Sequence, residues 1–177
     1  MLKKFCIAVA VIITLPFIIA LFVKSSYEVE REVLINQPKS TVFGYVKYLK
    51  NQDYFSKWAQ IDPEMTKSFQ GTDGEVGFIS AWQSEHPDVG HGEQEIMAMV
   101  DGERIDYQLR FLKPFEAVSP AYMITENAGE NQTKVKWAFQ GNMDYPMNIM
   151  LLFMDFEKII GDDLQLGLDN LKVILEE

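Results

Sequence analysis

The sequence has one cysteine, two histidines and few basic residues, and each shortage excludes a class of function. Cys6 lies in an apolar N-terminal stretch, so the rest of the chain has no thiol nucleophile and no disulfide, and packing alone must stabilise its core. Lys and Arg number 16 against 26 Asp and Glu, which gives a formal net charge of −10. Because phosphate backbones repel so acidic a chain, we exclude nucleic acid as a partner.

Familiar catalytic and cofactor motifs are also missing. The sequence has no serine nucleophile elbow, no phosphate-binding glycine loop and no His-Glu-x-x-His zinc helix. A metal site needs three or four converging ligands, whereas His86 and His91 lie in a predicted loop beside carboxylates, an arrangement typical of solvated side chains. We therefore expect no metal and no cofactor, and the role of the two histidines stays open.

The first 24 residues differ sharply from the rest of the chain. Residues 5–23 form an uncharged, mostly apolar run, which two lysines precede and Lys24 closes. At about 1.5 Å per residue, a helix of this length spans roughly 28 Å, close to the hydrocarbon thickness of a bilayer. We therefore predict a transmembrane anchor at residues 1–24, followed by one globular domain at residues 25–177.

A cleaved secretory signal is the alternative to an anchor. Its apolar region typically has about 7–15 residues and is followed by a small-residue cleavage site. The run here is longer, and residues 23–25 make a poor cleavage signal, so the sequence favours a retained anchor. The lysines before the run favour a single-pass protein with its N-terminus inside, which places the domain on the extracytoplasmic side of a membrane, in our expectation a bacterial inner membrane.

Hydrophobic periodicity beyond the anchor predicts an α+β domain. Its order is a first strand at residues 27–36, two short helices, six further strands and one final helix. The six later strands are predicted at residues 65–70, 75–84, 93–100, 105–111, 121–126 and 133–141. In the last of them Val135, Trp137 and Phe139 alternate with polar residues, which is typical of a sheet with one wet and one covered face.

The chain ends in a long amphipathic stretch. From Pro146 to Glu176, apolar residues recur at helical spacing and form a continuous stripe. Gly161 and Gly167 interrupt this stripe, but they permit close approach to a sheet. A curved antiparallel sheet can bury its apolar face by wrapping around such a helix. We therefore predict a core between the C-terminal helix and a concave sheet.

The beginning of this stretch is unusual, because nearly every residue from Met147 to Phe156 is apolar. A helix on the surface of a soluble domain normally shows a polar side. Burial under the loops, the mouth of a cavity, a dimer contact or contact with a nearby bilayer would each explain the pattern. The sequence leaves these alternatives open.

Four groups of residues form a pattern known from one protein family. They are Ile35-Asn36-Gln37-Pro38 leading into Val42-Phe43, the glycines at 71, 74 and 77 before Trp82, residues 133–137, and residues 167–172. With the order of elements, they resemble the START-like helix-grip superfamily, also called SRPBCC, in its polyketide cyclase/dehydrase and lipid-transport branch. The resemblance covers residues 27–177 and omits the anchor. It implies a cavity between helix and sheet in which members hold lipids, sterols, polyketides or other apolar ligands, and some members are cyclases or aromatases.

The predicted cavity wall is aromatic and rich in methionine, whose flexible thioethers suit a pocket that adapts to varied apolar ligands. The predicted lining residues are Phe78, Trp82, Tyr107, Leu109, Phe111, Tyr122, Trp137, Phe139, Met147, Met150 and Met154. Arg31 has the inward parity of its strand and is the candidate polar contact. For each residue, the alternative is that it simply fills the core.

We expect a membrane-tethered binding domain for an apolar small molecule or lipid. A cyclase, dehydratase or hydrolase-type enzyme would need a buried polar group with a perturbed pKa in the cavity, for which Tyr107, Tyr122 and Arg31 are the candidates. A non-catalytic protein-interaction module that uses Met147–Phe156 is the third hypothesis. The sequence favours binding over catalysis and leaves the oligomeric state open.

Overall fold

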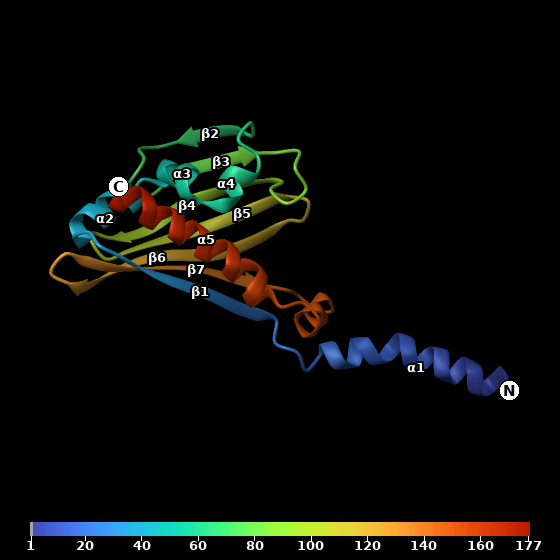
Figure 1. The fold of residues 1–177 in the computed structure, drawn as a ribbon. Helices are drawn as coiled ribbons and strands as arrows, with labels where there is room; N and C mark the ends of the chain where they lie inside the picture. The colour runs from blue at the N-terminus through green and yellow to red at the C-terminus, as the bar shows by residue number, and fades with distance from the viewer. Residues whose placement is uncertain (1) are drawn as a thin grey trace.

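A computed structural model of the protein describes residues 2–177. Its elements are α1 (Leu2–Ala20), β1 (Ser26–Ile35), α2 (Lys39–Val46), η1 (Leu49–Asn51), α3 (Gln52–Phe55), α4 (Lys57–Ile61), β2 (Thr66–Gln70), β3 (Ile79–Gln83), β4 (His91–Val100), β5 (Arg104–Lys113), β6 (Ala117–Gly129), β7 (Gln132–Asn142), η2 (Met147–Leu152) and α5 (Phe156–Glu176), where η marks a 3-10 helix. The predicted α+β order, with a curved sheet against a long C-terminal helix, is confirmed (Figure 1).

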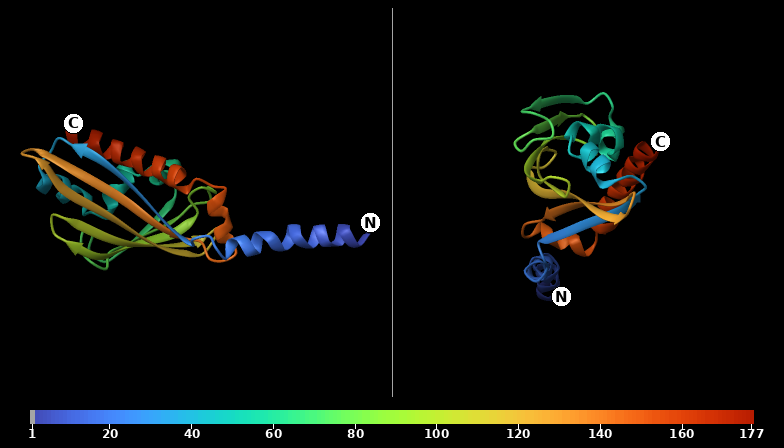
Figure 2. Two further views of the ribbon diagram at one scale, coloured as in Figure 1. Left: turned by 90° about the horizontal axis from the view of Figure 1, so that it is seen from below. Right: turned by 90° about the vertical axis from the view of Figure 1, so that its left-hand side faces the viewer.

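The seven strands form one antiparallel sheet in the order β1-β7-β6-β5-β4-β3-β2. The sheet curves, and all helices except α1 lie on its concave side or at its ends (Figure 2). Strand β3 is shorter than the predicted strand 75–84, because Gly74 and Gly77 adopt positive φ angles of 84° and 88°. This left-handed conformation, which glycine tolerates best, turns the chain before the strand begins.

The core lies between the concave face, α2 and α5. Leu164, Leu168 and Leu171 of α5 are fully buried at helical spacing, as the apolar stripe predicts. They meet inward-facing residues of the strands, including Val29, Val135 and Met123. Alternation along each strand puts these residues on the covered face and the charged ones on the other.

Helix α5 approaches the sheet closely at its two buried glycines. A Cβ atom at Gly167 would lie 2.7 Å from the ring of Trp137 in β7 and 3.4 Å from the carbonyl oxygen of Phe55. At Gly161, a Cβ atom would overlap the guanidinium of Arg31 in β1. The helix therefore packs mainly on β1, at one side of the concave face, and also contacts β7, α3 and α4.

The predicted C-terminal helix is interrupted, which corrects the single stretch expected from Pro146 to Glu176. The 3-10 helix η2 comes first, and α5 begins only at Phe156. Asp155 caps α5, because its side chain accepts a hydrogen bond of 2.9 Å from the backbone N–H of Lys158. Such caps satisfy N–H groups that a helix start leaves unpaired, so Asp155 fixes where the long helix begins.

Helix α1 projects away from the sheet (Figures 1 and 2). Apolar side chains such as Ile12, Ile13 and Phe17 are exposed along it, so α1 is not the buried core helix of a globular domain. By length and composition α1 is able to cross a membrane, and a signal sequence would pass the same test. It ends at Ala20, three residues before the end of the predicted run.

Alanine at Gly167 tests the close approach of α5 to the sheet. The added methyl group meets Trp137, so we expect Gly167→Ala to lower the free energy of unfolding by about 1–3 kcal/mol. Gly44→Ala in α2 is the matched control, because its new Cβ meets nothing within 4 Å. Alanine is favoured over glycine in a helix, so this control should be neutral or stabilising by about 0.5–1 kcal/mol. Urea unfolding of the full chain in detergent micelles measures both, and equal midpoints would contradict the packing.

Candidate functional site

A cavity of about 270 Å³ lies between the concave face and the helices α3, α4 and α5. Because α5 occupies the β1–β7 side, the short helices α3 and α4 cover the part of the sheet toward β2 and β3. The lining residues are Leu49, Gln52, Asp53, Ser56, Trp58, Ala59, Met65, Lys67, Ser80, Trp82, Asp88, Val89, Gln94, Leu109, Phe111, Ala121, Trp137, Ala138, Phe139, Ile160 and Leu164. A mostly apolar wall with a few polar groups is typical of small-molecule pockets.

Five of the predicted cavity residues lie at this wall, namely Trp82, Leu109, Phe111, Trp137 and Phe139. Edge-to-face contacts hold their rings in place: the ring centroids of Trp82 and Phe111 lie 6.3 Å apart, and those of Phe111 and Phe139 lie 6.4 Å apart. The alternation of side chains along the strands was sufficient to predict that these residues share one face, because each lies on the covered face of its strand.

Phe78 and Tyr107 face inward as predicted but belong to the packed core, away from the cavity wall. The ring of Phe78 stacks on Phe69 with centroids 6.1 Å apart. Tyr107 is fully buried, and burial raises the pKa of its hydroxyl far above its ordinary value, so the phenol stays neutral.

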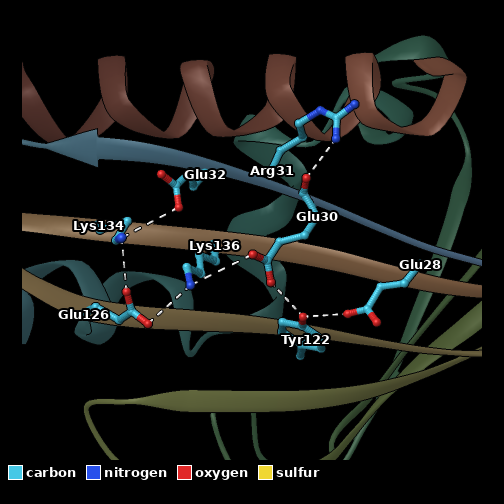
Figure 3. Close-up of polar contacts among 8 residues, drawn as sticks. All are labelled: Glu28, Glu30, Arg31, Glu32, Tyr122, Glu126, Lys134 and Lys136. Carbon is cyan, nitrogen blue, oxygen red and sulfur yellow. Dashed lines mark hydrogen bonds and ion pairs between the residues drawn. The ribbon is translucent and has the colours of Figure 1, made fainter. Parts of the chain in front are cut away.

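Tyr122 points away from the cavity, which corrects its predicted inward position. Its neighbours Ala121 and Met123 take the buried face of β6, so Tyr122 lies on the convex face. There its hydroxyl lies 2.7 Å from Glu28 Oε1 and 2.7 Å from Glu30 Oε2 (Figure 3). Desolvation, followed by these two carboxylates, raises the pKa of Tyr122. The residue belongs to the polar outer surface.

Ion pairs continue this outer surface across three strands. Lys134 and Lys136 of β7 both lie 3.5 Å from Glu126 of β6, and Lys134 also reaches Glu32 of β1 at 3.8 Å (Figure 3). Exposed ion pairs of this kind contribute little free energy individually. The network therefore keeps the convex face charged and soluble, and leaves the concave face for ligand chemistry.

Arg31 does not reach the cavity, although its inward parity is correct. The guanidinium lies against α5, where Nη2 donates a hydrogen bond of 3.0 Å to the carbonyl oxygen of Glu157 and Nη1 lies 3.7 Å from its carboxylate. The absence of a side chain at Gly161 leaves room for it. Arg31 thus joins β1 to α5 and is not the polar contact that parity suggested.

Met147, Met150 and Met154 also lie outside the cavity wall. The break before Asp155 directs η2 away from the sheet, toward the end of α1. Met147 and Met154 are exposed there. These methionines were predicted to face the sheet on the assumption that one continuous helix carries them. The helix is interrupted, so they do not face it.

The polar part of the wall was not predicted from the sequence; it includes Gln52 and Asp53 of α3, Lys67 of β2, Ser80 of β3 and Gln94 of β4. Gln52 is 8% exposed, and among the described residues its buried Nε2 atom has no hydrogen-bond partner. It lies beside the buried Tyr107 hydroxyl, and although no well-formed hydrogen bond joins the two among the described residues, the Gln52 amide partly offsets the rise in the pKa of Tyr107 that burial causes. Asp53 and Lys67 form an ion pair of 2.6 Å that joins α3 to β2 at the wall. Helices as short as α3 carry too little periodicity to reveal which side faces inward.

The two histidines lie at one end of the domain. His86 Nδ1 is 4.0 Å from Asp88, and His91, the first residue of β4 and not part of the loop as predicted, is 3.6 Å from Glu85. Within residues 2–177, the structure gathers no group of three His, Cys, Asp or Glu side chains able to hold a metal ion.

No protein-family model matches the sequence, and no curated protein matches it. Solved structures do match. Norcoclaurine synthase from Thalictrum flavum has a TM-score of 0.64 at 11% identity, over 90% of this chain and 92% of that chain. The Aha1 dimer from Colwellia psychrerythraea has a TM-score of 0.57 at 15% identity, over 85% and 96%.

The crystal structure of Ara h 8.0201 is similar in the same way, with a TM-score of 0.56 at 12% identity over 85% of this chain and 97% of that chain. At such low identities the likeness concerns the fold alone. The curved seven-stranded sheet, the long C-terminal helix and these matches together show that the chain has the Bet v 1-like helix-grip fold of SRPBCC proteins.

Proposed function

We propose that the protein is a membrane-tethered binding domain for an apolar small molecule or lipid. The observation that carries this proposal is the cavity of about 270 Å³, whose wall is predominantly aromatic and aliphatic. A helix-grip fold is typical of proteins that bind hydrophobic ligands, and here the void lies in the expected place, between helix and sheet. Residues 25–177 form the binding domain in this proposal, and residues 1–24 form its anchor.

The size of the cavity favours a compact ligand. Pockets for drug-sized molecules typically measure about 300–1,000 Å³, so this one lies just below that range. A two-chain lipid would exceed it, whereas a single acyl chain or a small ring system fits. The tether would keep the cavity beside a bilayer, where such molecules are concentrated.

Gln52 defines the polar requirement of the ligand. Its buried amide has no well-formed hydrogen bond among the described residues and lies beside the Tyr107 hydroxyl, so a rotation of this side chain toward the cavity would let Nε2 donate to a ligand oxygen. Asp53 and Lys67 neutralise one another at the wall, and the other carboxylate there, that of Asp88, is largely exposed to solvent. The preferred ligand is therefore apolar and carries one uncharged oxygen, such as a ketone or hydroxyl.

A cyclase, dehydratase or hydrolase-type enzyme is the second candidate, because norcoclaurine synthase shares the fold. Of the three residues suggested for acid–base chemistry, Tyr122 and Arg31 lie away from the cavity. The raised pKa of Tyr107 suits a hydrogen-bond donor and not a base. These positions favour binding over catalysis.

Filling the cavity tests the binding proposal. Ser80 of β3 lines the cavity, so Ser80→Phe should reduce the affinity for the neutral fluorescent probe N-phenyl-1-naphthylamine by at least about tenfold. Ala81→Phe is the matched control, because the adjacent residue of the strand points to the convex face. Fluorescence titration of the full chain measures both. Equal affinities in the two variants would place probe binding outside the cavity.

Replacing Gln52 tests the polar requirement. Gln52→Leu should weaken binding of 2-decanone about tenfold, corresponding to about 1.4 kcal/mol for one lost hydrogen bond, and leave decane unaffected. Competition against the same probe measures both ligands. If the two ligands lose affinity equally, the effect comes from altered packing, and Gln52 does not recognise an oxygen.

A further inference from the structure

The end of α1 is built into the globular domain. Asn148 of η2 is 3% exposed, and its Nδ2 donates hydrogen bonds of 2.8 Å to the carbonyl oxygen of Ala20 and 2.9 Å to that of Val23. One of these carbonyls belongs to the last residue of α1, and the other lies in the turn that follows, so Asn148 ties both the helix end and the turn to η2. Ala20 is buried in the same contact. The apolar helix is therefore held to the domain at a fixed attachment point, which we call the seat of α1.

The register of the sheet gathers several loops around this seat. Ser26 at the start of β1 lies opposite Asn142 at the end of β7, and His91 at the start of β4 lies opposite Lys113 at the end of β5. The connection from α1 to β1, the β5–β6 turn and the segment 143–155 are thus at one end of the molecule. We call it the loop end, and the β6–β7 hairpin lies at the opposite end (Figures 1 and 2).

Large apolar side chains protrude from the loop end. Phe22 is 86% exposed, Phe115 is 80% exposed and Phe153 is 78% exposed, and Leu21, Met147 and Leu152 are exposed beside them. They come from three segments far apart in the sequence: Phe22, Leu152 and Phe153 line one surface hollow, and Phe115 lies on the β5–β6 turn at the same end of the sheet. Exposed apolar groups clustered in this way mark a site of interaction.

We propose that the loop end docks on the surface of the lipid bilayer that α1 crosses, and that Asn148 fixes the domain in this orientation. The inference rests on the proposed anchoring of α1. The patch is continuous with α1, which is why we infer that a bilayer covers it. Leu21 and Phe22 follow directly after the apolar helix, so they must lie at the membrane surface if α1 spans the membrane. Aromatic residues and Lys24 at this level suit the interface between hydrocarbon and water.

The charge of the loop end favours an uncharged membrane surface. Glu116, Asp144 and Asp155 lie in the same loops as the exposed aromatic residues. Anionic headgroups would repel them, so docking depends on insertion of apolar side chains. Phosphatidylcholine vesicles are therefore the appropriate probe.

Spin labels on single cysteines test this orientation in the full chain. The background is Cys6→Ser, which removes the only cysteine, and the labels are attached at Phe153→Cys and Phe115→Cys, with Asn131→Cys in the β6–β7 hairpin as control. In phosphatidylcholine vesicles, we expect the first two labels to collide with oxygen and be shielded from a water-soluble nickel complex, and the third to behave oppositely. Equal exposure of all three labels to nickel would overturn the proposal.

Two further measurements distinguish a failure of docking from a failure of membrane anchoring and from self-association of the chain. Resistance to extraction at alkaline pH reports whether α1 spans the membrane, so a retained chain whose labels are all aqueous would refute docking alone. Spin–spin broadening at position 153, with shielding from nickel but no increase in collisions with oxygen, would assign the patch to a second copy of the chain and also refute docking.

The role of Asn148 is tested by Asn148→Leu, with the exposed Asn142→Leu as matched control. We expect the first variant to expose the label at position 153 to nickel without releasing the chain from the vesicles, and the control to leave it shielded. If Asn148→Leu does not fold, Phe153→Asp provides a second variant, because that side chain lies outside the core. It should expose the label at position 115, and unchanged shielding would contradict the proposal.

Discussion

The close seat of α5 on β1 and β7 is the constraint on which the rest of the structure depends. Gly161 and Gly167 let the helix lie directly against Arg31 and Trp137, which holds it to one side of the concave face. The remaining part of that face is covered by the short helices α3 and α4, and these do not fill it. The cavity is therefore a consequence of where the long helix packs. Its aromatic wall follows from strand alternation, and its polar groups come both from α3, as with Gln52, and from the strands, as with Ser80 and Gln94.

The start of α5 lies between the cavity and the loop end of the molecule. Because Asp155 caps the helix, the preceding apolar segment is free to turn away and pack on the end of α1. One capping residue thus separates two apolar surfaces that a continuous helix would have merged. Ile160 and Leu164 face the cavity, whereas Leu152 and Phe153 face outward at the loop end. In the proposed function, ligand binding and membrane contact would use different sides of the same C-terminal stretch.

Strand periodicity predicted the order of the elements, the covered face of the sheet and five of the eleven cavity residues, because inward parity depends only on local alternation. Periodicity failed for Tyr122, because both of its neighbours are also apolar and the alternation does not show which of the three faces inward. In the structure Ala121 and Met123 are buried, so Tyr122 faces outward. The methionines were misplaced because an apolar run does not reveal a capping aspartate within it. Gln52 was missed because it lies in a helix of one turn, whose orientation depends on tertiary packing. Arg31 was correctly predicted to face inward, but the sequence does not show that Gly161 of α5 lies against it and that it therefore contacts the helix and not the cavity.

Native mass spectrometry of the full chain, released from its host membrane into mild detergent, tests the central claim most directly. The account predicts an apolar mass bound at a ratio of one per chain, retained by Ala81→Phe and lost from Ser80→Phe. A chain that carries no ligand, and takes up none from a mixture of single-chain lipids and small ketones, would contradict it.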